Sequence, residues 1–208
     1  DIDRNVKSVL SRLGSYQLSD GAFAYWSGNT SGSEWGTVYA THFLIEAAKH
    51  GYGVDRAMLD RALKYLRGNP SDYYLTQAYT QYVLNGTPTR GAMNQLREKA
   101  ASLRSDVKWL LAAAYALDGN RKVAEELISL CGDNAGKANP YDGTYNSDER
   151  RMSISLITLT ILGRREEAFR TALKMSDILK KDRWLSTQST AWMLSTLSNF
   201  AVAGQNGI

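Results

Sequence analysis

Apolar residues along this chain form two kinds of helical segment. In the first kind they cover every side of the helix, as from Asp106 to Leu117 and, nearly so, from Trp35 to Ala48. In the second kind they recur at every third or fourth position, as at Ala168, Ala172 and Met175, with charged residues opposite. A helix that is apolar all round is buried all round, whereas a striped helix keeps one side in water. The pattern therefore predicts inner, buried helices and outer helices with one exposed face.

The two kinds of segment follow one another in regular order, so the repeating unit is a pair of helices. A serine followed by a carboxylate or threonine opens each inner helix, at spacings of about 34 to 42 residues. The serine hydroxyl can accept a hydrogen bond from a free N–H of the first turn, which makes it a strong cap. The five openings are Ser33-Glu34, Ser71-Asp72, Ser105-Asp106, Ser147-Asp148 and Ser186-Thr187. The predicted inner helices are 35–49, 72–85, 106–118, 148–162 and 186–202, and the outer ones are 55–67, 90–103, 121–130 and 165–181 after a first near 2–13.

Such helix pairs must stack, because a single pair cannot bury its apolar face. An open stack would not need inner helices so much more apolar than outer ones, whereas a closed ring would. We therefore predict an all-α fold, an α/α toroid of paired inner and outer helices. A ring of six pairs needs one more inner helix before Asp1, and the chain has no initiating Met. We expect a single toroid domain over 1–208, excised from a larger multidomain protein and incomplete by about one helix at its N-terminus.

Composition narrows the possible functions only slightly. The chain has 208 residues, of which 43% are hydrophobic and 22% charged, as in ordinary globular domains. Its net charge of +4 is spread over outer helix faces where both signs alternate, so we expect no nucleic-acid partner. No apolar run reaches the roughly 18–20 residues of a membrane span, so we expect no direct membrane insertion. A single cysteine, Cys131, excludes an internal disulfide framework.

Four segments, in order along the chain, resemble motifs of the bacterial α2-macroglobulin family. Residues 21–26, GAFAYW, resemble its GGFxYW turn, and 35–54 resemble the helix that follows it and ends in Gly-Tyr-x-Val. Residues 145–150, YNSDER, resemble its YGSxxR segment, and 184–191, WLSTQSTA, match its WLSTQxTA segment most closely. Two positions depart from the motifs: Ala22 stands where the family has its second glycine, and Asn146 stands where it has another. Asn tolerates left-handed backbone, so the second change is mild.

The resemblance implies a thioester (complement C3d-like) domain, which is an α/α toroid, within a protease-trapping protein of the bacterial cell envelope or periplasm. Its partners would be neighbouring domains of the parent protein and a target protease, and it would need no cofactor. In thioester-bearing members a Cys-x-Glu-Gln motif forms an internal thioester, and this thioester captures an attacking nucleophile of the protease. Cys131 is followed by Gly-Asp-Asn, so it does not match that motif, and it lies at the end of an outer helix. We expect the motif to lie before Asp1 or to be absent from the parent protein.

Under this resemblance the domain binds and is not an enzyme, so we assign no catalytic residue. The motif positions that we single out as structural are Phe23, Tyr25, Trp26, Trp184, Ser186, Thr187 and Gln188. Among them, Gln188, Trp26 and Tyr25 are the candidate binding residues. Gln188 lies in the first turn of the last inner helix, where it could contact a partner or only hold a neighbouring loop.

Other functions remain open from the sequence. His42, His50 and Cys131 could contribute to a zinc site, but His42 fits better as a hydrogen-bonded interior residue and His50 as a helix-end residue, so we assign no metal site. Toroids also serve as carbohydrate-active enzymes, glycosidases or polysaccharide lyases, which use paired carboxylates. The carboxylates at the helix openings could supply such a pair, but each is also explained by the helix dipole. These carboxylates are Glu34, Asp72, Asp106 and Asp148. A generic helical-repeat interaction scaffold is the third alternative.

Overall fold

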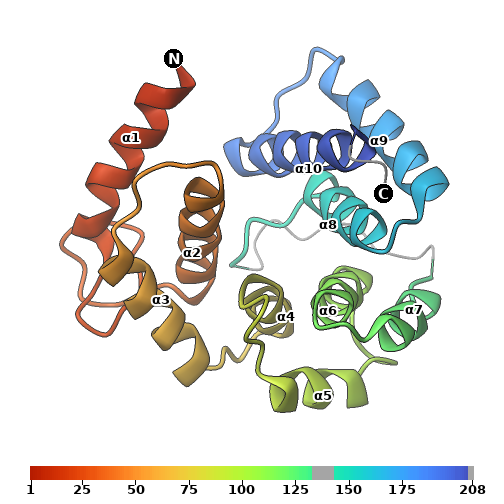
Figure 1. Ribbon diagram of the computed structural model, residues 1–208, viewed down its shortest axis with the longest axis horizontal. Coiled ribbons are helices and arrows are strands. Elements are labelled where there is room, and N and C mark those ends of the chain that lie inside the picture. The colour runs from red at the N-terminus through yellow and green to blue at the C-terminus, as the bar shows by residue number, and fades with distance from the viewer. Residues whose placement is uncertain (133–142, 206–208) are drawn as a thin grey trace. The chain divides into compact units, whose positions relative to one another are not determined.

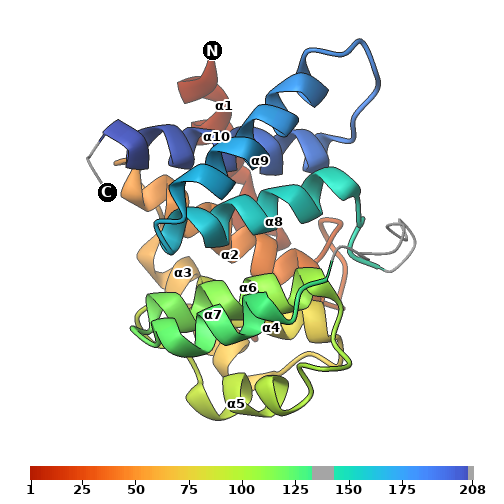
Figure 2. The same ribbon diagram turned by 90° about the vertical axis from the view of Figure 1, so that its right-hand side faces the viewer.

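The computed structural model describes residues 1–132 and 143–205, and in these ranges it contains ten α-helices (Figures 1 and 2). The same ranges hold no β-structure beyond an isolated antiparallel bridge between Gln17 and Phe23. None of the described helices is both long enough and apolar enough to cross a bilayer. The chain divides into two compact units, Asp1–Leu84 and Asn85–Ile208. The all-helical fold is thus confirmed, whereas the single domain and the closed ring stay predictions.

The first unit contains α1 (Ile2–Leu13), α2 (Glu34–Lys49), α3 (Arg56–Gly68) and α4 (Tyr74–Val83). Helix α2 packs against both α3 and α4 (Figure 1). A short 3₁₀ turn follows α1 and leads into a loop that enters the core at Phe23. One cluster in the core of this unit is formed by the buried residues Phe23, Leu44, Met58, Leu59 and Ala62.

The second unit contains the other six helices, in which consecutive helices pair as the sequence predicts. Helix α6 packs against α5, α7 and α8, and α8 packs against α9 and α10 (Figure 2). The hydroxyl of Thr158 in α8 donates to the backbone oxygen of Trp109 in α6 over 2.9 Å, which fixes the register of these two helices. The bounds are α5 (Arg90–Glu98), α6 (Ser105–Leu117), α7 (Arg121–Ser129), α8 (Asp148–Ile161), α9 (Arg165–Leu179) and α10 (Thr187–Gln205).

Helices α6 and α10 differ in how much of their surface is buried, although both were predicted to be buried on every side. Nine of the thirteen residues of α6 are buried, in agreement with the prediction. In α10, Leu194 and Val202 are about half exposed, and the buried positions lie along one face. The prediction is therefore wrong for α10, which packs against α8 and α9 along that face.

Helix α5 is shorter than the predicted segment 90–103. It ends at Glu98, and the chain continues in tight turns in which backbone N–H groups bond three residues back, as Ala100 does to Arg97. Ala100 and Leu103 are nevertheless buried, so the apolar spacing that suggested a longer helix reflects burial in turns.

Candidate functional site

One end of the second unit brings together the two motif segments 145–150 and 184–191. Their centre is Arg150 in the first turn of α8, a side chain with no exposed surface. Its guanidinium donates to the backbone oxygen of Thr144 and, over 2.9 Å, to the Thr144 hydroxyl. It also donates to the Gln188 side-chain oxygen over 3.2 Å. A buried guanidinium is costly unless acceptors surround it, so this arrangement holds the loop before α8 and the start of α10 together.

Serine hydroxyls join the same two helix starts. Ser147 caps α8 by accepting from the Arg150 N–H over 3.1 Å, and Ser186 caps α10 by accepting from the Ser189 N–H over 3.0 Å. The Ser186 hydroxyl then donates to Ser189, and Ser189 donates to Ser147, over 2.9 and 2.8 Å. Both predicted caps are confirmed, and Ser189 links them.

Two other predicted caps are wrong. Ser71 accepts from the Tyr73 N–H, but α4 begins three residues after it, and its hydroxyl donates to the Glu34 carboxylate. Ser105 is already the first residue of α6, which Arg104 precedes as the capping residue. The nearby Asp106 carboxylate accepts instead from its neighbour Val107 N–H over 3.0 Å. Ser33 does cap α2 as predicted, accepting from Gly36 over 3.0 Å.

The backbone before α8 differs from the prediction. Tyr145 has a φ of 51°, and it is the one non-glycine residue of the described ranges with a positive φ. Asn146, at the position of the family's glycine, does not use the left-handed conformation that Asn tolerates; it is buried, with 4% of its surface exposed. A bulky residue in the left-handed region costs about 1 kcal/mol or more.

The turn over residues 21–26 lies in the first unit. Gly21 has a φ of 100°, and a Cβ there would lie 2.4 Å from the backbone oxygen of Arg61, so only glycine fits. Phe23 is buried and accepts from the Ser33 N–H over 2.8 Å. Tyr25 and Trp26 are 45% and 74% exposed. The two predicted binding aromatics are therefore accessible, whereas Gln188 is partly buried in the other unit; their role in binding stays a prediction.

An apolar groove of about 520 Å³ lies between α1 and α2 in the first unit. Val9 and Leu13 of α1 form one wall, and Tyr39 and Phe43 of α2 form the other. Tyr25 also lines this groove, so the motif turn contributes to it.

His42 lies on the same side of α2 and is held inside the unit. One ring nitrogen lies 2.7 Å from the Tyr79 hydroxyl, and the ring meets Tyr82 edge-on at 5.6 Å. Burial disfavours the charged imidazolium and lowers the pKa of His42 to about 4. The prediction of a hydrogen-bonded interior histidine is confirmed, and His50 is the exposed residue that ends α2, as expected. In the described ranges no three His, Cys, Asp or Glu residues are placed to share a metal ion.

The carboxylates at the helix openings are mostly engaged by neighbours. The Glu34 carboxylate accepts from Ser71, Asp106 is buried and pairs with Arg104, and Asp148 pairs with Arg151. Asp72 is exposed. Each of the three engaged groups has a local structural role.

Cys131 follows α7 and is partly buried. Its sulfur lies 3.5 Å from the Leu127 backbone oxygen, and burial raises the pKa of the thiol to about 11. A thiol with this pKa is protonated at neutral pH and is a weak nucleophile.

We predict that Cys131 in the native chain reacts slowly with iodoacetamide at pH 8, because only about a thousandth of the thiol is ionised. Intact-mass spectrometry should show slow alkylation that accelerates on denaturation, and no methylamine adduct. The Cys131→Ser variant should lose about 1 kcal/mol of stability. A methylamine adduct on a glutamine with release of the Cys131 thiol would contradict our view that no thioester lies within this chain.

Sequence reasoning recognised the segment 145–150 but missed what Arg150 does. It also missed Arg183, which pairs with Glu149 and holds the loop before α10 against α8. The available signal was an arginine two residues before the uncharged run 152–162, where a charge needs buried partners.

No family model matches the chain. It is 29% identical to an alpha-2-macroglobulin of Xylella fastidiosa (strain Temecula1) over 88% of this chain and 13% of that protein. It is 27% identical to the alpha-2-macroglobulin of Escherichia coli K12 over 89% of this chain and 12% of that protein. The chain therefore spans only a small part of these relatives.

Solved structures show the same fold. The native E. coli alpha-2-macroglobulin fragment from domain MG7 to the C-terminus matches with a TM-score of 0.77 at 24% identity, over 94% of this chain and 34% of that one. The E. coli protein activated by porcine elastase matches with a TM-score of 0.75 at 23% identity, over 95% of this chain and 20% of that one. Salmonella alpha-2-macroglobulin reacted with methylamine matches with a TM-score of 0.75 at 25% identity, over 90% of this chain and 14% of that one. Sequence and fold thus both match one helical segment of bacterial alpha-2-macroglobulins.

Proposed function

We propose that this chain is the C3d-like thioester-domain segment of a bacterial alpha-2-macroglobulin, a non-catalytic part of a protein that traps proteases. The observation that carries the proposal is the similarity to such proteins over 88% of the chain, together with the shared fold. The two motif segments that are packed around Arg150 and Gln188 support it, because they form one structural unit at the helix starts.

The groove between α1 and α2 supports the finer proposal of an incomplete toroid. Its walls are apolar on two neighbouring helices of the first unit, and apolar surface of this size normally has a packing partner. We assign this place to the additional inner helix that the ring of six pairs requires. The Cys-x-Glu-Gln motif, where the parent protein has one, would belong to that helix.

In this proposal the target protease is captured by binding and by a change of conformation. The segment itself catalyses no reaction. A thioester needs a thiol and a glutamine in a site shielded from water. Cys131 has a raised pKa and no glutamine in the required register, so this chain would position the reactive helix without supplying the reactive groups. The neighbouring domains of the parent protein and the target protease are the partners, in the periplasm or at the cell envelope.

The alternative of a carbohydrate-active enzyme has less support. Such an enzyme needs two carboxylates free to exchange protons with substrate. Glu34, Asp106 and Asp148 are each engaged by a neighbouring side chain. We therefore favour a binding role.

The parent protein tests this proposal. After incubation with pancreatic elastase it should be cleaved and should co-elute with the protease in size-exclusion chromatography. The trapped elastase should still cleave a small peptide amide but not a large protein substrate. Elastase inactivated at its catalytic serine should not be captured, because cleavage must trigger the conformational change. Co-elution of the inactivated protease to the same extent, or no complex with the active one, would contradict the proposal.

A further inference from the structure

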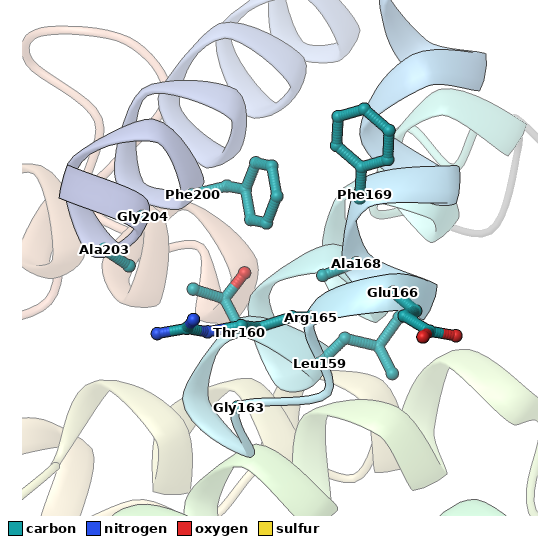
Figure 3. Close-up of a pocket in the computed structure, with 10 residues that line it drawn as sticks. All are labelled: Leu159, Thr160, Gly163, Arg165, Glu166, Ala168, Phe169, Phe200, Ala203 and Gly204. Carbon is teal, nitrogen blue, oxygen red and sulfur yellow. The ribbon is translucent and has the colours of Figure 1, made fainter. Parts of the chain in front are cut away.

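A second cavity lies within the second unit, where the end of α8, the start of α9 and the end of α10 meet (Figure 3). Its volume of about 370 Å³ is within the usual size of small-ligand sites. The lining residues are Leu159, Thr160, Gly163, Arg165, Glu166, Ala168, Phe169, Phe200, Ala203 and Gly204. None of them belongs to the motif segments, so the cavity is separate from the site described above.

The walls of this cavity are apolar. Leu159 and Ala168 are buried in the core of the unit and form part of the lining. The rings of Phe169 and Phe200 stand on opposite sides of the open space in Figure 3. Phe169 is 55% exposed, so a large aromatic surface remains in water when the cavity is empty. An apolar body between the two rings would remove this surface from water.

Two charged residues, Arg165 and Glu166, line the cavity. Within the described ranges the Arg165 guanidinium has no ion pair or hydrogen bond, and its side chain extends along the same side as Thr160 (Figure 3). Glu166 points to the other side and lies 3.7 Å from Arg170. The Thr160 hydroxyl donates to the Leu156 backbone oxygen over 2.7 Å, so its proton is already used. Arg165 is therefore the side chain that can donate to a bound anion.

From these observations we infer that the cavity binds a small apolar monocarboxylate. The hydrocarbon or aromatic part lies between Phe169 and Phe200, and the carboxylate receives hydrogen bonds from the Arg165 guanidinium. Guanidinium and carboxylate match in charge and in planar geometry. The inference does not depend on the proposed function.

Decanoate and decanol, which share a chain length and differ in charge, test this inference. Both are titrated into the full 208-residue chain and followed by NMR of the backbone amides. We expect both to shift amides near Phe169 and Phe200, and decanoate to bind about fivefold more tightly, the upper size of an exposed ion pair. Equal affinities for decanoate and decanol would overturn the inference that the site recognises a carboxylate. Shifts confined to other parts of the chain would overturn the site.

Three variants separate specific binding from general hydrophobic association. Arg165→Gln should abolish the preference for decanoate and leave decanol binding unchanged, whereas Lys174→Gln, on the exposed side of the same helix, should preserve the preference. Gly204 lines the cavity, and a Cβ added there meets no atom within 4 Å, so Gly204→Leu should place an apolar side chain at the cavity without a clash and weaken the binding of both ligands. Undiminished binding to Gly204→Leu, or loss of the preference in Lys174→Gln, would overturn the inference.

Discussion

Replacing Ala113 by aspartate should unfold the second unit. Ala113 lies in the middle of α6 and has no exposed surface, with Leu110, Ala112 and Ala114 also buried around it. A carboxylate there would lose its water and would have no room for partners. We expect a loss of about 4 kcal/mol or more, a size found for few single substitutions.

The matched control for Ala113→Asp is Arg170→Asp. Arg170 lies on the exposed side of α9, where it is 3.7 Å from Glu166, and its side chain is 63% exposed. This change should cost about 0.5 kcal/mol or less, as surface substitutions usually do. Urea denaturation followed by circular dichroism measures both variants. Similar denaturation midpoints would show that α6 is not the buried inner helix that its sequence predicts.

Replacing Arg150 by leucine should have the second-largest effect. The leucine fits an apolar interior, but it leaves three acceptors without their donor: the backbone and side-chain oxygens of Thr144 and the side-chain oxygen of Gln188. Buried acceptors that lose their partner cost about 1–3 kcal/mol each. We expect a loss of about 3 kcal/mol or more in the free energy of unfolding.

A graded comparison identifies the cause of that loss. Gln188→Ala removes one of the three acceptors and keeps the two contacts of Arg150 with Thr144, so it should cost about 1 kcal/mol. Equilibrium denaturation of both variants gives the two values. If Gln188→Ala costs as much as Arg150→Leu, the Thr144 contacts contribute nothing and our description of Arg150 as the centre of this end is wrong.

The helices of this chain could be predicted because each apolar pattern persists over several turns. All ten described helices begin within two residues of the predicted positions, and α5 alone ends well short of its predicted end. Helix α5 could not be bounded from the sequence because no glycine or proline follows Glu98; the chain leaves the helix through turns that bury Ala100 and Leu103.

The candidate site was harder to predict because it depends on contacts between segments distant in the sequence. The motif residues were identified, but the burial of Arg150 follows only when Thr144 and Gln188 are placed beside it. Ser105 is followed by a carboxylate as the true caps Ser33 and Ser147 are, yet α6 begins at Ser105 itself, and Asp106 pairs with the preceding Arg104. Local propensity is a weak guide where long-range contacts, such as that of Arg150 with Gln188, compete with it.

The hydroxyl of Ser189 has a consequence for how this end of the molecule opens. It accepts from Ser186 and donates to Ser147, so the caps of two helices about 40 residues apart share one hydrogen-bonded chain. Fraying of either helix start breaks a bond on which the other depends, and hydrogen bonds in a chain strengthen one another. We therefore expect the first turns of α8 and α10 to open and close together as one cooperative unit in local unfolding.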